Sequence, residues 1–262
     1  MADNCDGAPP AMSALNRHAE AYRPGRLLEV VRPVGVHGAP VVLLWHGSGP
    51  DERDGLVPLA TAVAAYGTVA LVPDWRSDDV VVGAEELLAS IDFAVDAAAE
   101  LGGDPGRVVL VGWSLGASAA ADIALHPEIA GGWHPSGLVG LGGGYDRTPF
   151  GGIPPRDPMA GDSVNGAGRQ ALFVHGTSDS LISVDRSAVG AGVLAIAGWH
   201  AVLHQVGTDH AGVIGTVYDR TARRCVPSAD SDRQAALAAV AREVAMIALA
   251  LDVPDGDSPI QV

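Results

Sequence analysis

Between Val108 and Ala120, an apolar run is followed by the pentapeptide Gly112-Trp113-Ser114-Leu115-Gly116 and then by an alanine-rich stretch. This order predicts a buried strand, a sharp turn that exposes Ser114, and a helix that begins directly after the turn. A serine held in such a turn is a candidate nucleophile. It could instead be an ordinary serine at the start of a helix, but the flanking glycines after a buried strand favour the strand-to-helix elbow.

Apolar runs with the length of strands alternate with helical patterns along the rest of the chain. Strands are expected at residues 26–34 (an early or edge strand), 41–45, 69–72, 108–111, 137–141, 171–174 and 201–206. Helices are expected at residues 55–66, 84–101, 115–125, 185–198 and 232–251. This alternation predicts the α/β fold class, with a mostly parallel, doubly wound sheet and helices on both faces.

The 262 residues contain no long polar linker, so a single domain with a large core is expected. Its predicted limits are residues 26–251. Residues 1–25 are expected to form an irregular lead-in with at most one helical turn around Ala14–Ala21, and residues 252–262 a loose tail. The glycine-rich segment 142–168 has the least regular pattern, and it is expected to be a surface excursion or a cover over a site.

Charge and hydropathy exclude several classes of partner. All sixteen basic residues are arginine, and 31 acidic residues give a formal net charge of −15. A surface of this sign repels a polyanion, so we expect no binding to nucleic acid. No apolar run is long enough to span a bilayer, and the first residues lack the basic-then-apolar layout of a signal peptide, so we expect a cytoplasmic protein that does not bind membranes.

Reactive side chains gather where the expected strands end. In an open parallel sheet, ligands bind at the carboxyl ends of the strands. Four such ends carry polar residues, namely His46-Gly47-Ser48-Gly49, Ser114, His175-Gly176-Thr177-Ser178-Asp179 and Gly207-Thr208-Asp209-His210. A serine hydroxyl is a weak nucleophile that needs a histidine as base and an acid to orient the histidine. The chain order Ser114, Asp179, His210 supplies such a triad.

With these motifs the chain resembles the α/β-hydrolase superfamily of serine hydrolases over about residues 26–251, and it is similar to small microbial carboxylesterases and lipases. The segments 72–76 and 99–105 add to the likeness to the carboxylesterases. The resemblance implies an oxyanion hole made by the backbone N–H of Leu115 with that of Ser48, or of Gly49 in its place. The chain departs from the His-Gly-Gly-Gly loop of hormone-sensitive-lipase-like esterases at Ser48.

Two acids compete for the third position of the triad. Asp146 follows the strand expected at 137–141, which is the other place where this superfamily can put its acid. Asp179 could merely cap the following turn. We favour Asp179 because its His-Gly-x-x-Asp setting matches the motif.

The other histidines and ion pairs are interpreted as structural. His204 lies inside an expected strand and is interpreted as a packed core residue, whereas His200 precedes that strand at the opposite sheet edge from the other candidates. His46 is expected to bond loop backbone, and Asp74 is expected to form a local ion pair with Arg76. No His-Glu-x-x-His or Cys-x-x-Cys spacing occurs, so neither a metal nor a cofactor is expected.

The predicted activity is hydrolysis of a small-molecule carboxylic ester through an acyl-enzyme. The short cover segment favours a small to medium acyl group. The expected pocket comprises Trp45, Gly49, Trp113 and Leu115, with Phe150 and Ile153 as further candidates. An aminopeptidase or amidase with the same triad and a non-catalytic ligand-binding homologue are the alternatives, and self-association into a homo-oligomer is left open.

Overall fold

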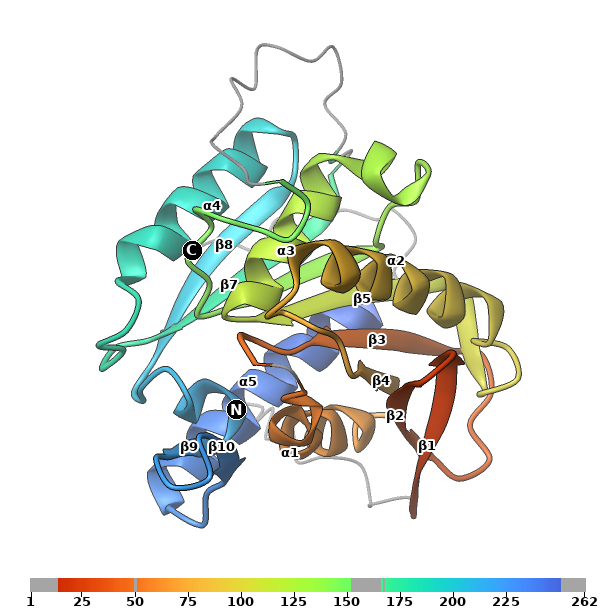
Figure 1. The fold of residues 1–262 in the computed structure, drawn as a ribbon, viewed down its shortest axis with the longest axis horizontal. Helices are drawn as coiled ribbons and strands as arrows, with labels where there is room; N and C mark the ends of the chain where they lie inside the picture. The colour runs from red at the N-terminus through yellow and green to blue at the C-terminus, as the bar shows by residue number, and fades with distance from the viewer. Residues whose placement is uncertain (1–13, 50, 152–165, 167, 251–262) are drawn as a thin grey trace, which may run out of the picture.

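Eight strands form one sheet in the order β1-β2-β4-β3-β5-β6-β7-β8, seen nearly along its edge in Figure 1. The computed structural model describes residues 14–49, 51–151, 166 and 168–250. The strands are β1 (Leu15–Arg23), β2 (Arg26–Pro33), β3 (Ala39–Trp45), β4 (Val69–Pro73), β5 (Gly103–Trp113), β6 (Gly137–Leu141), β7 (Gln170–Gly176) and β8 (His200–Val206). Strands β3 to β8 run parallel, and β1 and β2 pair antiparallel at one edge.

Helices cover both faces of the sheet (Figure 1). They are α1 (Arg53–Ala64), α2 (Val80–Asp96), α3 (Leu115–Leu125), α4 (Val184–Ile196) and α5 (Ser231–Leu249). Along β3, Leu43 and Trp45 belong to the apolar cluster that includes α2, α3 and α4, whereas Val42 and Leu44 belong to the cluster with α1 and α5. Every residue of β3 is therefore buried, which explains why this strand reads as an uninterrupted apolar run.

The predicted fold class is confirmed. Each expected strand and helix is present, and the largest difference at a helix start is that α2 begins at Val80 rather than at residue 84. The side chain of Asp79 causes this earlier start, because it accepts a hydrogen bond from the Val82 N–H at 3.1 Å and so caps the first turn. Among the described helices, none has the length and hydropathy needed to cross a membrane.

The expectation of an irregular lead-in at residues 1–25 is wrong for its second half. Strand β1 pairs with β2 along nearly its whole length, so β2 lies inside the sheet and β1 forms its edge. Most side chains of β1 remain accessible to solvent, and they include charged residues at several positions. A strand of this kind lacks the apolar pattern by which strands are recognised, because Tyr22 is its only buried residue.

Some of the sequence expectations fall on segments that the structure does not describe. Residues 152–165 and 167 account for most of the expected excursion, so its interpretation as a cover lies outside the described residues, as does the tail at 252–262. A short hairpin of β9 (Thr216–Asp219) and β10 (Arg224–Pro227) follows the 3-10 helix η3 (Gly212–Ile214), and none of these three elements was expected from the sequence.

Candidate active site

The turn between β5 and α3 holds Ser114 in a strained backbone conformation. Its φ of 56° and ψ of −116° lie in a region that residues other than glycine rarely adopt. A Cβ on Gly112 would lie 2.1 Å from the carbonyl oxygen of Gly116, and a Cβ on Gly116 would lie 2.3 Å from the carbonyl oxygen of Trp45. Only glycine at both positions lets α3 begin this close to β3 and β5, and this close approach places the serine at the carboxyl edge of the sheet.

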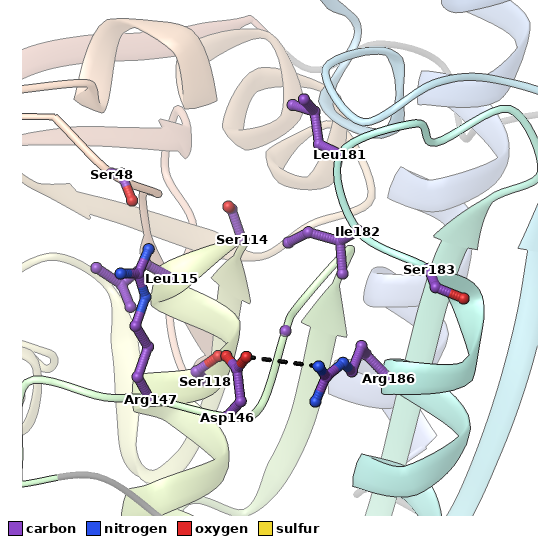
Figure 2. Close-up of a pocket in the computed structure, with 11 residues that line it drawn as sticks. Ser48, Ser114, Leu115, Ser118, Asp146, Arg147, Leu181, Ile182, Ser183 and Arg186 are labelled. Carbon is purple, nitrogen blue, oxygen red and sulfur yellow. Dashed lines mark ion pairs between the residues drawn. The ribbon is translucent and has the colours of Figure 1, made fainter.

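A pocket of about 470 Å³ opens at this edge of the sheet. Its lining comes from the loop after β3, the start of α3, the loop after β6, and the loop between β7 and α4 (Figure 2). The lining residues are Ser48, Ser114, Leu115, Ser118, Gly144, Asp146, Arg147, Leu181, Ile182, Ser183 and Arg186. The volume is that of a small-molecule site, and the sheet edge is the one expected from the sequence.

His210 and Asp179 contact each other beside the loop between β7 and α4, of which Leu181 and Ile182 line this pocket. The Nδ1 atom of His210 lies 2.7 Å from Oδ2 of Asp179, and the Asp179 side chain is only 1% exposed. The second carboxylate oxygen accepts hydrogen bonds from the backbone N–H groups of Leu181 and Ile182, both at 2.9 Å. Because the carboxylate is fixed through both oxygens, it holds the proton of His210 on Nδ1 and leaves Nε2 as the basic nitrogen.

His175 also contacts this carboxylate, and it was not singled out from the sequence. The ring is fully buried, with Nε2 lying 3.3 Å from Oδ2 of Asp179 and 2.9 Å from the carbonyl oxygen of Ile182. Its Nδ1 lies 2.8 Å from Oγ of Ser187 on α4. His175 thus ties the end of β7 to α4 around the carboxylate. The His-Gly-x-x-Asp spacing was the available signal, since it places the histidine four residues before the acid.

Trp113 contacts His210 through a hydrogen bond and through its ring. Its indole N–H donates a 3.0 Å hydrogen bond to the carbonyl oxygen of His210, and the two ring centroids lie 5.3 Å apart. The preceding residue, Asp209, is anchored by Arg233, which binds both carboxylate oxygens. Trp113 was expected in the pocket, but its side chain is buried and it is not among the residues that line this pocket.

Two other expected pocket residues also lie away from the cavity. Trp45 is fully buried, and its indole N–H donates to Oγ of Ser90 at 3.0 Å. Gly49 is absent from the lining because its loop turns away toward Ser77, whose Oγ accepts a 2.6 Å hydrogen bond from the Gly49 N–H. Phe150 packs against the core, and Ile153 lies outside the described residues.

The two amides expected to form the oxyanion hole border the pocket. Leu115 is the first residue of α3, so its N–H has no acceptor within the helix. Ser48 lines the same pocket, and its N–H has no acceptor within the described part of the chain. The Gly49 amide, which was the alternative to that of Ser48, is already bonded to Ser77.

The alternative acid, Asp146, does not contact His210. Its side chain is 55% exposed and lies 3.8 Å from the guanidinium of Arg186. Of the two acids considered, the structure therefore brings only Asp179 to the histidine.

His46 has the structural place expected for it. Burial lowers the pKa of its ring to about 4, so the ring is neutral. Its Nδ1 donates to the carbonyl oxygen of Gly47 at 2.8 Å, and its Nε2 accepts from the N–H of Trp75 at 3.3 Å. His46 thus joins the loop after β3 to the loop after β4.

The prediction of an ion pair between Asp74 and Arg76 is wrong. Arg76 pairs with Asp78 at 2.6 Å, because their side chains lie on the same side of the turn that leads into α2. Asp74 instead lies 3.2 Å from Arg26, which begins the neighbouring strand β2.

His204 was expected to be a packed core histidine, and this expectation is wrong. Strand β8 is the edge strand of the sheet, so part of its surface faces solvent, and the His204 side chain is 51% exposed beside Glu243 at 3.1 Å. His200 is also exposed, at the amino end of β8.

One group of potential metal ligands occurs among the described residues. Ligand atoms of His46, Asp51 and Asp74 lie within 4.8 Å of one another. Both ring nitrogens of His46 are already engaged by backbone groups, and the Asp74 carboxylate faces two arginines, Arg26 and Arg53. His46 could bind a cation only by giving up a backbone contact, and the two arginines repel a cation beside Asp74.

No family model matches the chain, and no curated protein matches it in sequence. Solved structures do match. A Thermogutta terrifontis esterase determined with propionate bound is 17% identical, with a TM-score of 0.65 over 95% of this chain and 99% of its own. A thermostable esterase from Pseudomonas putida is 18% identical, with a TM-score of 0.61 over 93% and 85% of the two chains. A hyperthermophilic esterase from the archaeon Pyrobaculum calidifontis is 18% identical, with a TM-score of 0.61 over 91% and 87%.

These likenesses extend over almost the whole chain and concern the arrangement of the sheet and its helices. The protein therefore has the α/β-hydrolase fold, as the sequence predicted.

Proposed function

We propose that this protein is a serine hydrolase that cleaves carboxylic esters through an acyl-enzyme intermediate. The observation that carries the proposal is the 2.7 Å contact between His210 and the buried carboxylate of Asp179, next to the pocket that Ser114 lines. A buried carboxylate in this position orients the imidazole and stabilises the imidazolium that forms when the histidine takes a proton. The conformation of Ser114 after a buried strand further supports its role as the nucleophile.

In this mechanism, Oγ of Ser114 attacks the ester carbonyl carbon while its proton moves to Nε2 of His210. The carbonyl oxygen becomes an oxyanion, which the N–H groups of Leu115 and Ser48 stabilise. The C–O bond to the alcohol then breaks, and His210 returns the proton to the departing alkoxide. Water attacks the acyl-enzyme with the same proton transfers and releases the carboxylic acid and free Ser114.

The pocket favours a small to medium acyl group. Its volume of about 470 Å³ is at the lower end for small-molecule sites. Leu115, Leu181 and Ile182 supply apolar surface for a short chain. The names of the structural neighbours also support ester hydrolysis, and one of those esterases was determined with the short-chain acid propionate bound. The scheme uses no cofactor.

The experiment is a series of p-nitrophenyl esters from acetate to laurate, with kcat/KM measured for each chain length. We expect turnover to be highest for short and medium chains and to fall toward laurate. Ser114→Ala should abolish turnover above background, whereas Ser231→Ala, which replaces the exposed first residue of α5, is the matched control. Unchanged turnover in the Ser114 variant would overturn the proposal.

A further inference from the structure

The pocket beside Ser114 carries an excess of positive charge in a strongly acidic protein. The chain has a formal net charge of −15. Two of the eleven lining residues, Arg147 and Arg186, are arginines, and the only acid among them is Asp146. The sign of charge at the pocket is thus opposite to that of the whole chain. Lining charges act on a ligand at close range, so they decide which ligands the pocket accepts.

One of the two guanidinium groups is left for a ligand. Arg186 lies 3.8 Å from Asp146, and Figure 2 shows this ion pair between the loop after β6 and helix α4. Within the described residues, Arg147 has no carboxylate at ion-pair distance. In the same view its side chain extends from the loop after β6 toward Leu115 and Ser48, the residues beside the serine. Among the described residues, the pocket therefore presents a guanidinium without a carboxylate partner near Ser114.

The opposite wall adds to this potential. Ser183 caps helix α4 and lines the pocket together with Arg186 in the first turn of the helix. The amino end of this 13-residue helix carries partial positive charge, which the carboxylate of Asp185 in its first turn offsets in part. Leu181 and Ile182 precede it and give the same wall an apolar part. A ligand with a short apolar stem and an anionic end would match both properties.

We propose that the substrate of this pocket is an ester that carries a carboxylate, such as the monoester of a short dicarboxylic acid, and that Arg147 binds this carboxylate. The inference rests on the proposed function of Ser114. A guanidinium forms two parallel hydrogen bonds with a carboxylate, and this geometry selects a carboxylate over a neutral group of the same shape. A neutral ester would offer no carboxylate to Arg147.

The test compares two substrates that differ only in charge. Monomethyl glutarate carries a free carboxylate, and in methyl glutaramate an amide replaces it. The measured quantity is the ratio of kcat/KM for the acid ester to that for the amide ester. We expect this ratio to exceed about tenfold in the wild type, because one charge-assisted hydrogen-bonded pair provides discrimination of this order. The ratio should also fall as NaCl is added, since salt screens an accessible charge pair.

Arg147→Gln should lower the ratio at least tenfold, and Arg147→Lys should restore part of it. Arg147 is exposed, so its replacement removes no buried contact. Arg220→Gln, an exposed arginine in the turn between β9 and β10, is the matched control and should leave the ratio unchanged.

The outcomes separate this inference from the proposed function. If Ser114 reacts with a fluorophosphonate and the amide ester is cleaved as well as the acid ester, the inference is overturned and the hydrolase function stands. An equal ratio in the wild type and in Arg147→Gln would also overturn the inference and leave the hydrolase function standing. If Ser114 does not react and neither ester is cleaved, the proposed function fails and this inference fails with it.

Discussion

His210 Nδ1 and Asp179 Oδ2 lie 2.7 Å apart, although 31 residues separate them in the chain. The parallel sheet makes this contact, because β7 and β8 are neighbours and both loops leave the sheet at the same edge. In the proposed mechanism this pair supplies the base that activates Ser114.

Asp179→Asn tests this pair. The amide is isosteric, but its NH2 group favours a His210 ring with the proton on Nε2, and such a ring cannot accept the serine proton. We expect kcat to fall by about 10³ to 10⁴ with little change in the thermal midpoint. Asp146→Asn is the matched control because Asp146 lines the pocket without contacting His210. A large loss of kcat in the Asp146 variant, with activity retained in the Asp179 variant, would show that the acid is wrongly assigned.

Gly116→Ala tests the packing of the elbow. The new Cβ would lie 2.3 Å from the carbonyl oxygen of Trp45 and 2.5 Å from that of His46, so backbone must move. We expect a loss of about 3 kcal/mol or more in the free energy of unfolding, measured by urea denaturation. Gly192→Ala in α4 is the contrasting variant, since its Cβ would meet nothing within 4 Å, and it should add roughly 0.5–1 kcal/mol. Equal effects of the two substitutions would contradict this description of the elbow.

Trp113→Phe tests the support of His210. The variant keeps an aromatic ring against the imidazole and removes the N–H that donates to the His210 carbonyl oxygen. The freed carbonyl lets the histidine loop shift, and we expect kcat to fall about tenfold, in line with the loss of one buried hydrogen bond. Steady-state kinetics should show this loss mainly in kcat. Trp133→Phe, in the loop before β6, should change neither parameter, and a larger effect there than at Trp113 would argue against the positioning role.

His46 should make stability depend on pH. Burial lowers the pKa of its ring from 6.5 to about 4. Between these two pH values the unfolded chain binds a proton that the folded protein does not. The contribution of His46 to the free energy of unfolding is therefore complete above pH 6.5 and is lost as the pH drops toward 4. This group alone should remove about 2 kcal/mol from the free energy of unfolding between pH 7 and pH 5.

The measurement for His46 is urea denaturation at both pH values. His46→Gln should be less stable than the wild type at pH 7, and its stability should fall less on acidification. If wild type and variant lose the same amount between pH 7 and pH 5, His46 does not titrate as described.

The sheet could be predicted from the sequence because burial leaves a mark on composition. Strand β3 is buried on both faces, so Val41 to Trp45 are all apolar. The elbow positions 112 and 116 require glycine, because an added Cβ would lie 2.1 to 2.3 Å from a backbone carbonyl oxygen. Strand β1 could not be predicted in this way, because most of its side chains are exposed or half-buried and it pairs with β2 through its backbone, with Tyr22 as its one buried residue.

The candidate site was predictable only in part. The order of Ser114, Asp179 and His210 was readable, but Asp146 also follows a strand, and only the contact with His210 distinguishes the two acids. Trp113 acts through His210, which lies 97 residues further along the chain, and no local pattern could reveal that contact.

The central claim is that Ser114 is the nucleophile, and covalent labelling tests it most directly. The protein is treated with a fluorophosphonate, digested, and analysed by mass spectrometry. We predict one adduct per chain, located on Ser114, and no adduct in Ser114→Ala. Labelling should also slow strongly in Asp179→Asn, because the reaction needs the same base. An unlabelled Ser114, or an adduct on a different residue, would contradict the account.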